Sequence, residues 1–313
     1  MQSVKLCLAF LLLSPSCFSQ DKDSLDNERL AKMINLSEVI VRTDVNVPKF
    51  MDRVKNDTTF YKAFKNLHVL GFTSLNDIRI VDKKGNGKAG MQSKTVQTRS
   101  YGCRTMETLT ETTQGDFYDS KHNFNYYTAE LYAGLFFTNG KVCGENNIVA
   151  GTNFSAKGKS GTDKHKEQLK MLFFNPGKKI PGIPFIGDKI NIFDPDVAEL
   201  YDFSIDQVDY EGKQAYLFVV KAREDLGGKR NKIVIDNMTT WFDAKTMEVM
   251  ARNYKMSYDA GVYDFDVEME VEMTKFNGYL VPKTLRYKGN WDVVLKKRER
   301  GFFAATLFDF KQE

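Results

Sequence analysis

The sequence has 313 residues, with 45 lysines and arginines against 41 aspartates and glutamates, and a formal net charge of +4. Acidic and basic residues are interspersed along it, which argues against the clustered positive charge of a nucleic-acid-binding surface. Every apolar run is shorter than the eighteen residues that a membrane-spanning helix requires, so we expect no such helix.

The N-terminus predicts export. Lys5 precedes an apolar run, LCLAFLLL (residues 6–13), and small residues follow, which is typical of a secretory signal peptide. Cleavage after Ser19 would divide the chain into a signal peptide (1–19), a polar segment (20–46) and a single domain (47–313). In an alternative interpretation Cys17 carries a lipid anchor, although Ser14 stands where such a site has an aliphatic residue.

Two cysteines remain once the signal peptide is removed, Cys103 and Cys143. In an oxidising compartment they can form one disulfide. The chain-entropy model predicts that closing a loop of this size stabilises the fold by up to about 4 kcal/mol. Two separate buried thiols are the alternative.

Two short helices are predicted before the first strand. Asn46 followed by Pro48 indicates the start of one helix. Asp57 or Thr58 can cap a second helix, in which Phe60 begins an apolar stripe. We also interpret the polar segment before Asn46 as a short surface helix or a tether.

From residue 67 the apolar period changes to two, which predicts strands over 67–81 and 92–110 with a glycine-rich turn at 85–90 between them. Residues 126–137 (YYTAELYAGLFF) precede an Asn-Gly pair and predict one strand of a hairpin. A helix is predicted over 163–173.

Residues 175–196 (NPGKKIPGIPFIGDKINIFDPD) hold four of the seven prolines together with many isoleucines and phenylalanines. Proline disfavours a helix or a central strand here, so we predict an apolar loop. Ile183, Phe185 and Ile186 are the candidate residues of a lid over a ligand. Packing of the loop against its own domain is the alternative.

After residue 198, eight short strands separated by turn signals, one of them Gly289-Asn290, predict an antiparallel meander that curls. In the segment DFDVEMEVEM (264–273) carboxylates alternate with apolar residues. We expect the carboxylates to lie on a solvated face and to pair with basic residues of the flanking strands, namely Arg252, Lys255, Lys283, Arg286 and Lys288.

The opposite face of the meander is rich in methionine, a flexible and polarisable residue that suits surfaces binding varied apolar ligands. A curved sheet with such a lining could enclose a lipid-sized cavity. The candidate lining residues are Trp241, Met250, Met256, Phe265, Met269 and Met273. Ordinary core packing of the same residues is the alternative.

The sequence contains fragments of cofactor-binding motifs, but the residues around them do not fit such sites. The sequence GNGKAG (85–90) is followed by a strand pattern, whereas a dinucleotide site needs a helix there. Gly158-Lys159-Ser160 has Asn153 where a phosphate-binding loop needs glycine. The three histidines are isolated and give no metal pattern. We therefore expect no cofactor, no metal and no nucleotide.

The order of elements resembles the Lol-type (LolA- and LolB-like) lipoprotein carriers and lipoprotein-sorting proteins of Gram-negative outer membranes. The resemblance lies in TTWFDAKTMEVMARNYKMSYDAG (Thr239–Gly261) and FNGYLVPKTLRYKG (Phe276–Gly289). It implies a mainly β (α+β) fold, in which a curved antiparallel sheet forms an unclosed, barrel-like meander with a few helices packed on or plugging its concave face.

The function that follows is that of a non-enzymatic, periplasmic or outer-membrane-associated protein. It would bind a lipid or a lipoprotein acyl chain, with an outer-membrane protein as a further partner. The first alternative is a structural or interaction module with a solid core, and the second is an unrecognised secreted hydrolase. The sequence predicts no nucleic-acid partner.

Overall fold

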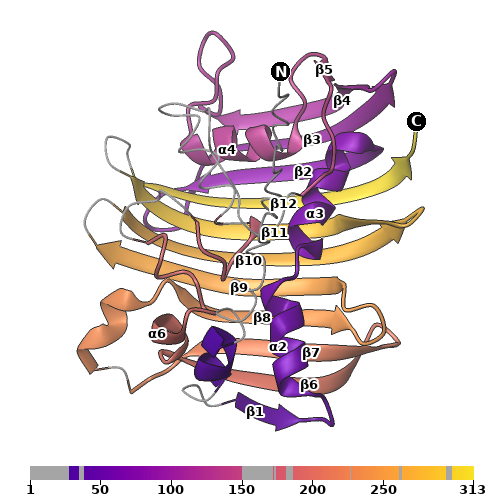
Figure 1. Ribbon diagram of the computed structural model, residues 1–313. Helices are drawn as coiled ribbons and strands as arrows, with labels where there is room; N and C mark the ends of the chain where they lie inside the picture. Colours follow the sequence, from indigo (N-terminus) through magenta and orange to yellow (C-terminus); the bar gives the residue numbers. More distant parts are fainter. Residues whose placement is uncertain are drawn as a thin grey trace, which may run out of the picture.

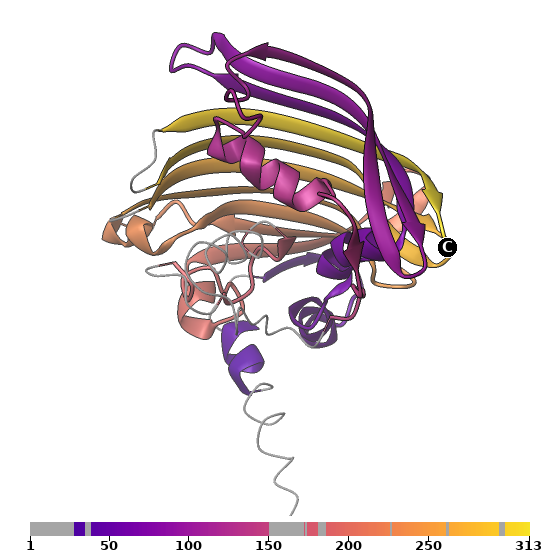
Figure 2. The same ribbon diagram turned by 90° about the horizontal axis from the view of Figure 1, so that it is seen from above.

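The computed structural model describes residues 28–34, 39–149, 172, 174–180, 186–225, 227–260, 263–293 and 298–313. Within these ranges it contains one twelve-stranded sheet that curves around the helices without closing into a barrel (Figures 1 and 2), as the sequence predicts. The strand order is β1-β6-β7-β8-β9-β10-β11-β12-β2-β3-β4-β5. All neighbouring strands are antiparallel except β1 and β6, which are parallel.

The strands alternate along the chain with a small number of short helices. The strands are β1 (Val39–Arg42), β2 (Gly71–Val81), β3 (Gly87–Ser100), β4 (Cys103–Gly115), β5 (Val142–Cys143), β6 (Tyr201–Tyr210), β7 (Lys213–Ala222), β8 (Ile235–Asp243), β9 (Val249–Ala260), β10 (Tyr263–Phe276), β11 (Tyr279–Val293) and β12 (Glu299–Lys311). The helices are α2 (Val47–Lys55), α3 (Thr59–Asn66), η1 (Leu67–Val69), α4 (Tyr127–Phe136), α6 (Pro195–Ala198) and η2 (Gly227–Lys232). Among the described residues, no helix has the length and apolarity needed to cross a bilayer.

The alternation in β10 produces the predicted two-sided strand. Its inward residues, from Phe265 to Val271, are buried, while its carboxylates lie on the outer face and pair with bases across the neighbouring strands. The ion pairs are Lys255–Asp266, Lys255–Glu268, Lys288–Glu268, Arg286–Glu270 and Arg298–Asp264. Such exposed pairs contribute little to stability individually, so they mainly set the register and solubility of this face.

The C-terminal strand completes the sheet between the two halves of the chain. β12 pairs with β11 on one side and with β2 on the other, so Phe303 is opposite both Tyr287 and Ile78. Strands β2, β3 and β4 are therefore attached to the C-terminal meander through β12, whereas β1 pairs directly with β6.

The segment predicted as a hairpin strand, residues 126–137, instead forms helix α4. The cause is a long-range cap. The carboxylate of Glu299 on β12 accepts hydrogen bonds at 2.8 Å from the backbone N–H groups of Tyr127 and Thr128, the first residues of the helix. A carboxylate at a helix N-terminus satisfies N–H groups that the helix cannot, and it interacts favourably with the helix dipole.

The predicted turn at Gly289-Asn290 is also wrong, because β11 continues through it from Tyr279 to Val293. The backbone is extended at Gly289, and the side chains of Tyr287 and Trp291 fill the space where a side chain of residue 289 would lie. A Cβ there would lie 1.9 Å from the Tyr287 hydroxyl and 2.7 Å from the Trp291 indole nitrogen. The Trp291 indole N–H donates to the Tyr287 hydroxyl across this glycine. Eight predicted strands therefore become seven.

The described part of the polar N-terminal segment contains a short helix, which agrees with one of its two predicted interpretations. Residues 28–34 are helical, with Leu30 and Met33 buried, and β1 extends the sheet beside β6. Residues 1–27, which include the predicted signal peptide and Cys17, lie outside the described residues, as does nearly all of the predicted helix at 163–173.

The predicted disulfide between Cys103 and Cys143 is confirmed. It joins β4 to the two-residue strand β5, which pairs with the sheet only at Cys103 and Arg104. The bond therefore attaches the segment that follows α4 to one end of β4.

Reduction of this disulfide is expected to lower the free energy of unfolding by up to about 4 kcal/mol, because it releases a loop with a sequence separation of 40 residues. Urea unfolding with and without dithiothreitol measures the change. The double variant Cys103→Ser/Cys143→Ser is the control and should not respond to the reductant. Equal midpoints for oxidised and reduced wild-type protein would contradict the expectation.

Candidate functional site

The concave face of the sheet, meaning the inward side chains of β6–β12 and β2, is continuous and mostly apolar. Partner residues across the strands point to the same side, so rows such as Phe242–Val249 and Val271–Leu285 run across the sheet. The buried members of the central strands are Met238, Tyr254, Met256, Phe265, Val267, Met269, Val271, Leu285 and Tyr287. A face of this size has to be shielded from water.

Short, separate segments shield it, rather than a second sheet. We call α2, α3, α4 and residues 172–200, as far as they are described, the cover. Figure 2 shows the strands arching over these helices. Phe50 of α2 contacts the rings of Tyr216, Phe218 and Phe242 at centroid distances of 5.6–6.0 Å, and Tyr132 of α4 contacts Phe303 at 4.9 Å.

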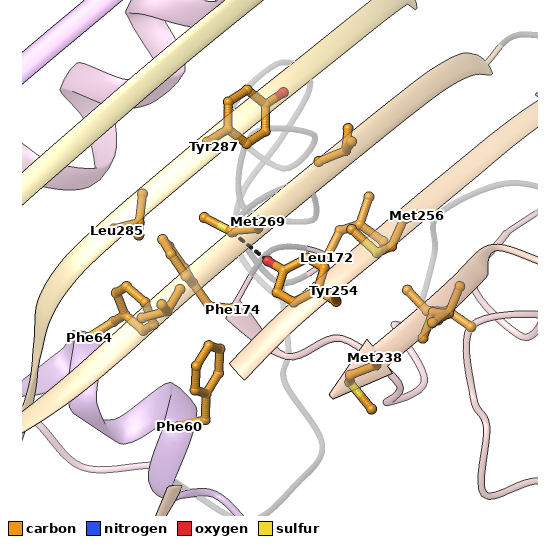
Figure 3. Close-up of a cluster of buried hydrophobic side chains, with 14 of the residues drawn as sticks. Phe60, Phe64, Leu172, Phe174, Met238, Tyr254, Met256, Met269, Leu285 and Tyr287 are labelled. Atoms are coloured by element: carbon orange, nitrogen blue, oxygen red, sulfur yellow. Dashed lines mark hydrogen bonds between the residues drawn. The ribbon is translucent and has the colours of Figure 1, made fainter. Parts of the chain in front are cut away.

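The centre of the concave face is occupied by aromatic side chains of the cover (Figure 3). Phe64 of α3 stacks on Phe174 with ring centroids 4.0 Å apart, and Phe60 packs edge-on against Phe64 at 5.5 Å. Leu172 and Phe174 lie toward Met269 and Tyr254 of the sheet, and the Tyr254 hydroxyl donates to the Met269 sulfur.

Three of the six predicted lining residues lie on the concave face, namely Met256, Phe265 and Met269, which are at most 2% exposed. Met250 and Met273 are half-buried beside two β-bulges and line a hollow of about 140 Å³ at the strand ends. Trp241 lies on the outer face, where it contacts Tyr210 at 5.4 Å. Whether these residues contact a ligand stays a prediction.

The Pro-rich loop packs on its own domain wherever it is described. Of the three predicted lid residues, Ile186 is buried at 1% exposure, and Ile183 and Phe185 lie outside the described residues. Gly177 takes a positive φ of 85° and lies against Ile192, so the loop turns back onto the concave face. The described part of the loop therefore belongs to the cover.

The hollows found among the described residues lie around the rim and the outer face of the sheet. Their volumes run from about 140 to about 550 Å³. The largest of these five lies beside Phe302 on the outer face, and none of the five is lined by Met256 or Met269. A hollow of about 490 Å³ is lined by the predicted residue Phe265 together with Ile233 and Tyr258. Leu172 and Phe174 pack on the concave face near Met269, and a ligand-sized cavity there stays a prediction.

Two buried cations near α3 were missed by the sequence analysis. Arg252, predicted to pair with carboxylates on the outer face, instead points to the concave side and is 5% exposed. It shares the inward parity of Met256, and this parity was the signal that could have placed it. Its Nε donates to the Thr240 hydroxyl at 3.0 Å, and its guanidinium lies 4.4 Å from the centroid of the Phe60 ring.

The second cation is Lys178, whose ammonium group donates to the backbone carbonyls of Val54 and Lys55 at the end of α2. A cation at a helix C-terminus satisfies carbonyls that the helix leaves free. Burial lowers the pKa of Lys178 to about 7, an effect that Asp57 opposes and Arg252 increases. Burial also lowers the pKa of Arg252, again against the effect of Asp57.

A polar network anchors the end of the sheet beside the disulfide. Arg104 donates to Glu145 and Thr138, and Glu145 accepts from His68, whose Nδ1 lies 2.9 Å from the carboxylate. Burial lowers the pKa of His68 to about 4, despite the favourable charge of Glu145. The network links η1 to β4, so we interpret it as structural.

The described residues contain no group of three or more His, Cys, Asp or Glu side chains placed to hold a metal ion. No family model and no curated protein matches the chain.

Three solved structures match the chain at low similarity. A DUF1329 family protein from Desulfovibrio piger is 10% identical, with a TM-score of 0.25 over 93% of this chain and 92% of that one. An outer membrane lipoprotein-sorting protein domain from Vibrio parahaemolyticus is 8% identical, with a TM-score of 0.26 over 81% and 89%. Lipovitellin is 8% identical, with a TM-score of 0.27 over 78% of this chain and 25% of its own. These values establish neither a family nor a ligand for this chain.

Truncation in the cover tests its contribution to stability. Phe174→Ala is expected to lower the free energy of unfolding by about 3–5 kcal/mol, because it removes a buried ring stacked on Phe64. The matched control is Phe302→Ala on the outer face, where the ring is 38% exposed and the loss should stay below about 1 kcal/mol. Equal losses in chemical denaturation would contradict this assignment of the cover.

The pH dependence of stability tests the polar network. Since the folded pKa of His68 is about 4 and its unfolded value is near 6.5, the unfolded state binds more protons between these values. Stability should therefore fall as the pH is lowered from 6.5 to 5, and this slope should be smaller in His68→Gln. His122→Gln, at an exposed site, is the control. An NMR titration of His68 with a midpoint at or above 6.5 would contradict the prediction.

Proposed function

We propose that this protein is a non-enzymatic lipid carrier that holds an acyl chain between the concave face of its sheet and the cover. The acyl chain would belong to a free lipid or to a lipoprotein. It would occupy the apolar surface around Met256, Phe265 and Met269, in the place of Leu172 and Phe174.

The observation that carries this proposal is the construction of the cover. A broad apolar face is shielded by three short helices and an irregular segment, which are joined to the sheet by side-chain contacts and hydrogen bonds and not by strand pairing. Such segments can be displaced without breaking the hydrogen bonds of the sheet, because those bonds run between strands. Methionines on the face below can adapt their shape to a chain that replaces the cover.

The energy of such an exchange is close to balance for a long acyl chain. Each buried CH₂ group contributes about 0.8 kcal/mol, so a chain of about ten buried groups contributes roughly 8 kcal/mol. That amount is similar to the roughly 5–10 kcal/mol expected for the loss of a buried leucine and a stacked phenylalanine from the core.

The compartment in the proposal is the cell envelope, in the periplasm or at the outer membrane. The disulfide between Cys103 and Cys143 supports an oxidising location, as does the signal-like N-terminus. An outer-membrane protein would then be the acceptor or donor of the lipid.

One observation favours a second candidate, an interaction module with a solid core. Phe64 and Phe174 already stack at 4.0 Å on the concave face, as they would in a protein with no guest. In that case the apolar residues serve only as a core.

A displacement assay with a fluorescent fatty acid distinguishes the lipid carrier from the interaction module with a solid core. The carrier predicts saturable binding of anthroyloxy-labelled stearate to the delipidated protein, competition by unlabelled palmitate, and a rise in the unfolding midpoint with ligand concentration. Lipid recovered in organic extracts of protein purified from its native envelope would agree. No probe binding together with an unchanged midpoint would overturn the carrier and favour the solid core.

A further inference from the structure

We propose that Arg252 binds the anionic head group of the amphiphile whose acyl chain lies on the concave face. The head group is a carboxylate or a phosphate. This inference rests on the proposed function and specifies the ligand class that it leaves open.

The hydrogen-bond state of Arg252 is the first observation. A guanidinium carries five N–H donors, and only Nε is used here, by the Thr240 hydroxyl. Among the described residues, neither Nη atom has an acceptor, and no carboxylate lies within 4.0 Å of the group. Arg252 nevertheless is only 5% exposed and remains charged at any ordinary pH. The Nη atoms are not among the fully buried side-chain atoms without a partner, so they retain some solvent-accessible surface that an anion could contact.

The second observation is the charge around Arg252. Lys178 and Arg252 both interact with Asp57, which opposes the lowering of their pKa values by burial. One oxygen of that carboxylate already accepts from the backbone N–H and the hydroxyl of Thr59. Since burial lowers the pKa of Lys178 to about 7, Arg252 is the lasting positive charge of the two, and a bound anion would add to the compensation that Asp57 gives.

The shape of the group fits this role. The two Nη atoms of a guanidinium form a planar fork that matches two oxygens of a carboxylate or phosphate. Phe60 covers the flat side of the group and Thr240 holds its Nε, so the fork is oriented before any ligand arrives.

The position of the group also fits an amphiphile. Arg252 is opposite Val271 on β10, and the inward row continues through Met269 to Phe265. Met256 lies four residues along β9, roughly 13 Å away. A head group on Arg252 would thus place an acyl chain along the methionine-rich centre of the concave face.

The test compares ligands that differ only in the head group. Three ligands are compared: palmitate, palmitoyl lysophosphatidic acid and hexadecanol. Their binding to the delipidated protein is measured by how well each displaces an uncharged fluorescent probe, an anthroyloxy-labelled stearate ester of a neutral alcohol. Wild-type protein should bind the two acids at least tenfold more tightly than hexadecanol. Arg252→Met should lower the affinity for the acids at least tenfold and leave that for hexadecanol unchanged. Arg286→Met on the outer face, whose side chain pairs with Glu270, is the control and should change neither.

Each outcome is informative. Equal wild-type affinities for acid and alcohol would overturn the role of Arg252 while leaving the carrier intact, and this comparison does not need the variant to fold. Absence of binding for all three ligands would overturn the carrier as well. If acetate and inorganic phosphate bind as tightly as palmitate, Arg252 belongs to a site for small anions. That result would overturn the proposal that the ligand is an amphiphile. Ligand-free Arg252→Met should keep or raise its unfolding midpoint, because it removes an unpaired buried charge. A large drop would mark Arg252 as structural and contradict the proposal.

Discussion

The shielding of one broad apolar face from water is the constraint on which the rest of this structure depends. A sheet of this width presents many inward side chains, and curvature alone cannot bring them together because the sheet does not close. The helices between residues 47 and 66, α4 and the Pro-rich loop therefore converge on the concave side, although they come from three distant parts of the chain. Their aromatic residues provide the contact area that the sheet lacks.

The same constraint explains why the cover is divided into short pieces. β4 and β6 lie near opposite ends of the strand order, and the described parts of the segment between them pack on the concave face. Side chains fix each piece to the sheet: Phe50 contacts β7 and β8, Asn66 of α3 donates to the Leu280 carbonyl, and α4 is capped by Glu299. A cover made in this way can be stable and still separable, which is the physical basis for proposing a carrier.

The two faces of the sheet differ in how their charged side chains are paired. On the outer face the carboxylates of β10 meet bases from both neighbours, and water screens every pair. On the concave face Arg252 has no such partner among the described residues, and the low dielectric of the interior makes its charge costly. A cation on the concave face below the cover is a different feature from the surface pairs, even though it lies on a strand that contributes to them.

Local patterns by themselves determined the period-two strands, the two-sided character of β10, both N-terminal helices and the pairing of Cys103 with Cys143, because these depend on neighbours in sequence or on having one available partner. Only the tertiary structure decided that residues 126–137 are helical, since the cap comes from Glu299 across the sheet. Only the tertiary structure decided that β11 passes through Gly289, since Tyr287 and Trp291 meet over it. The contacts of Arg252 with Phe60 and of Phe174 with Phe64 likewise join segments far apart in the chain, and no local pattern encodes them.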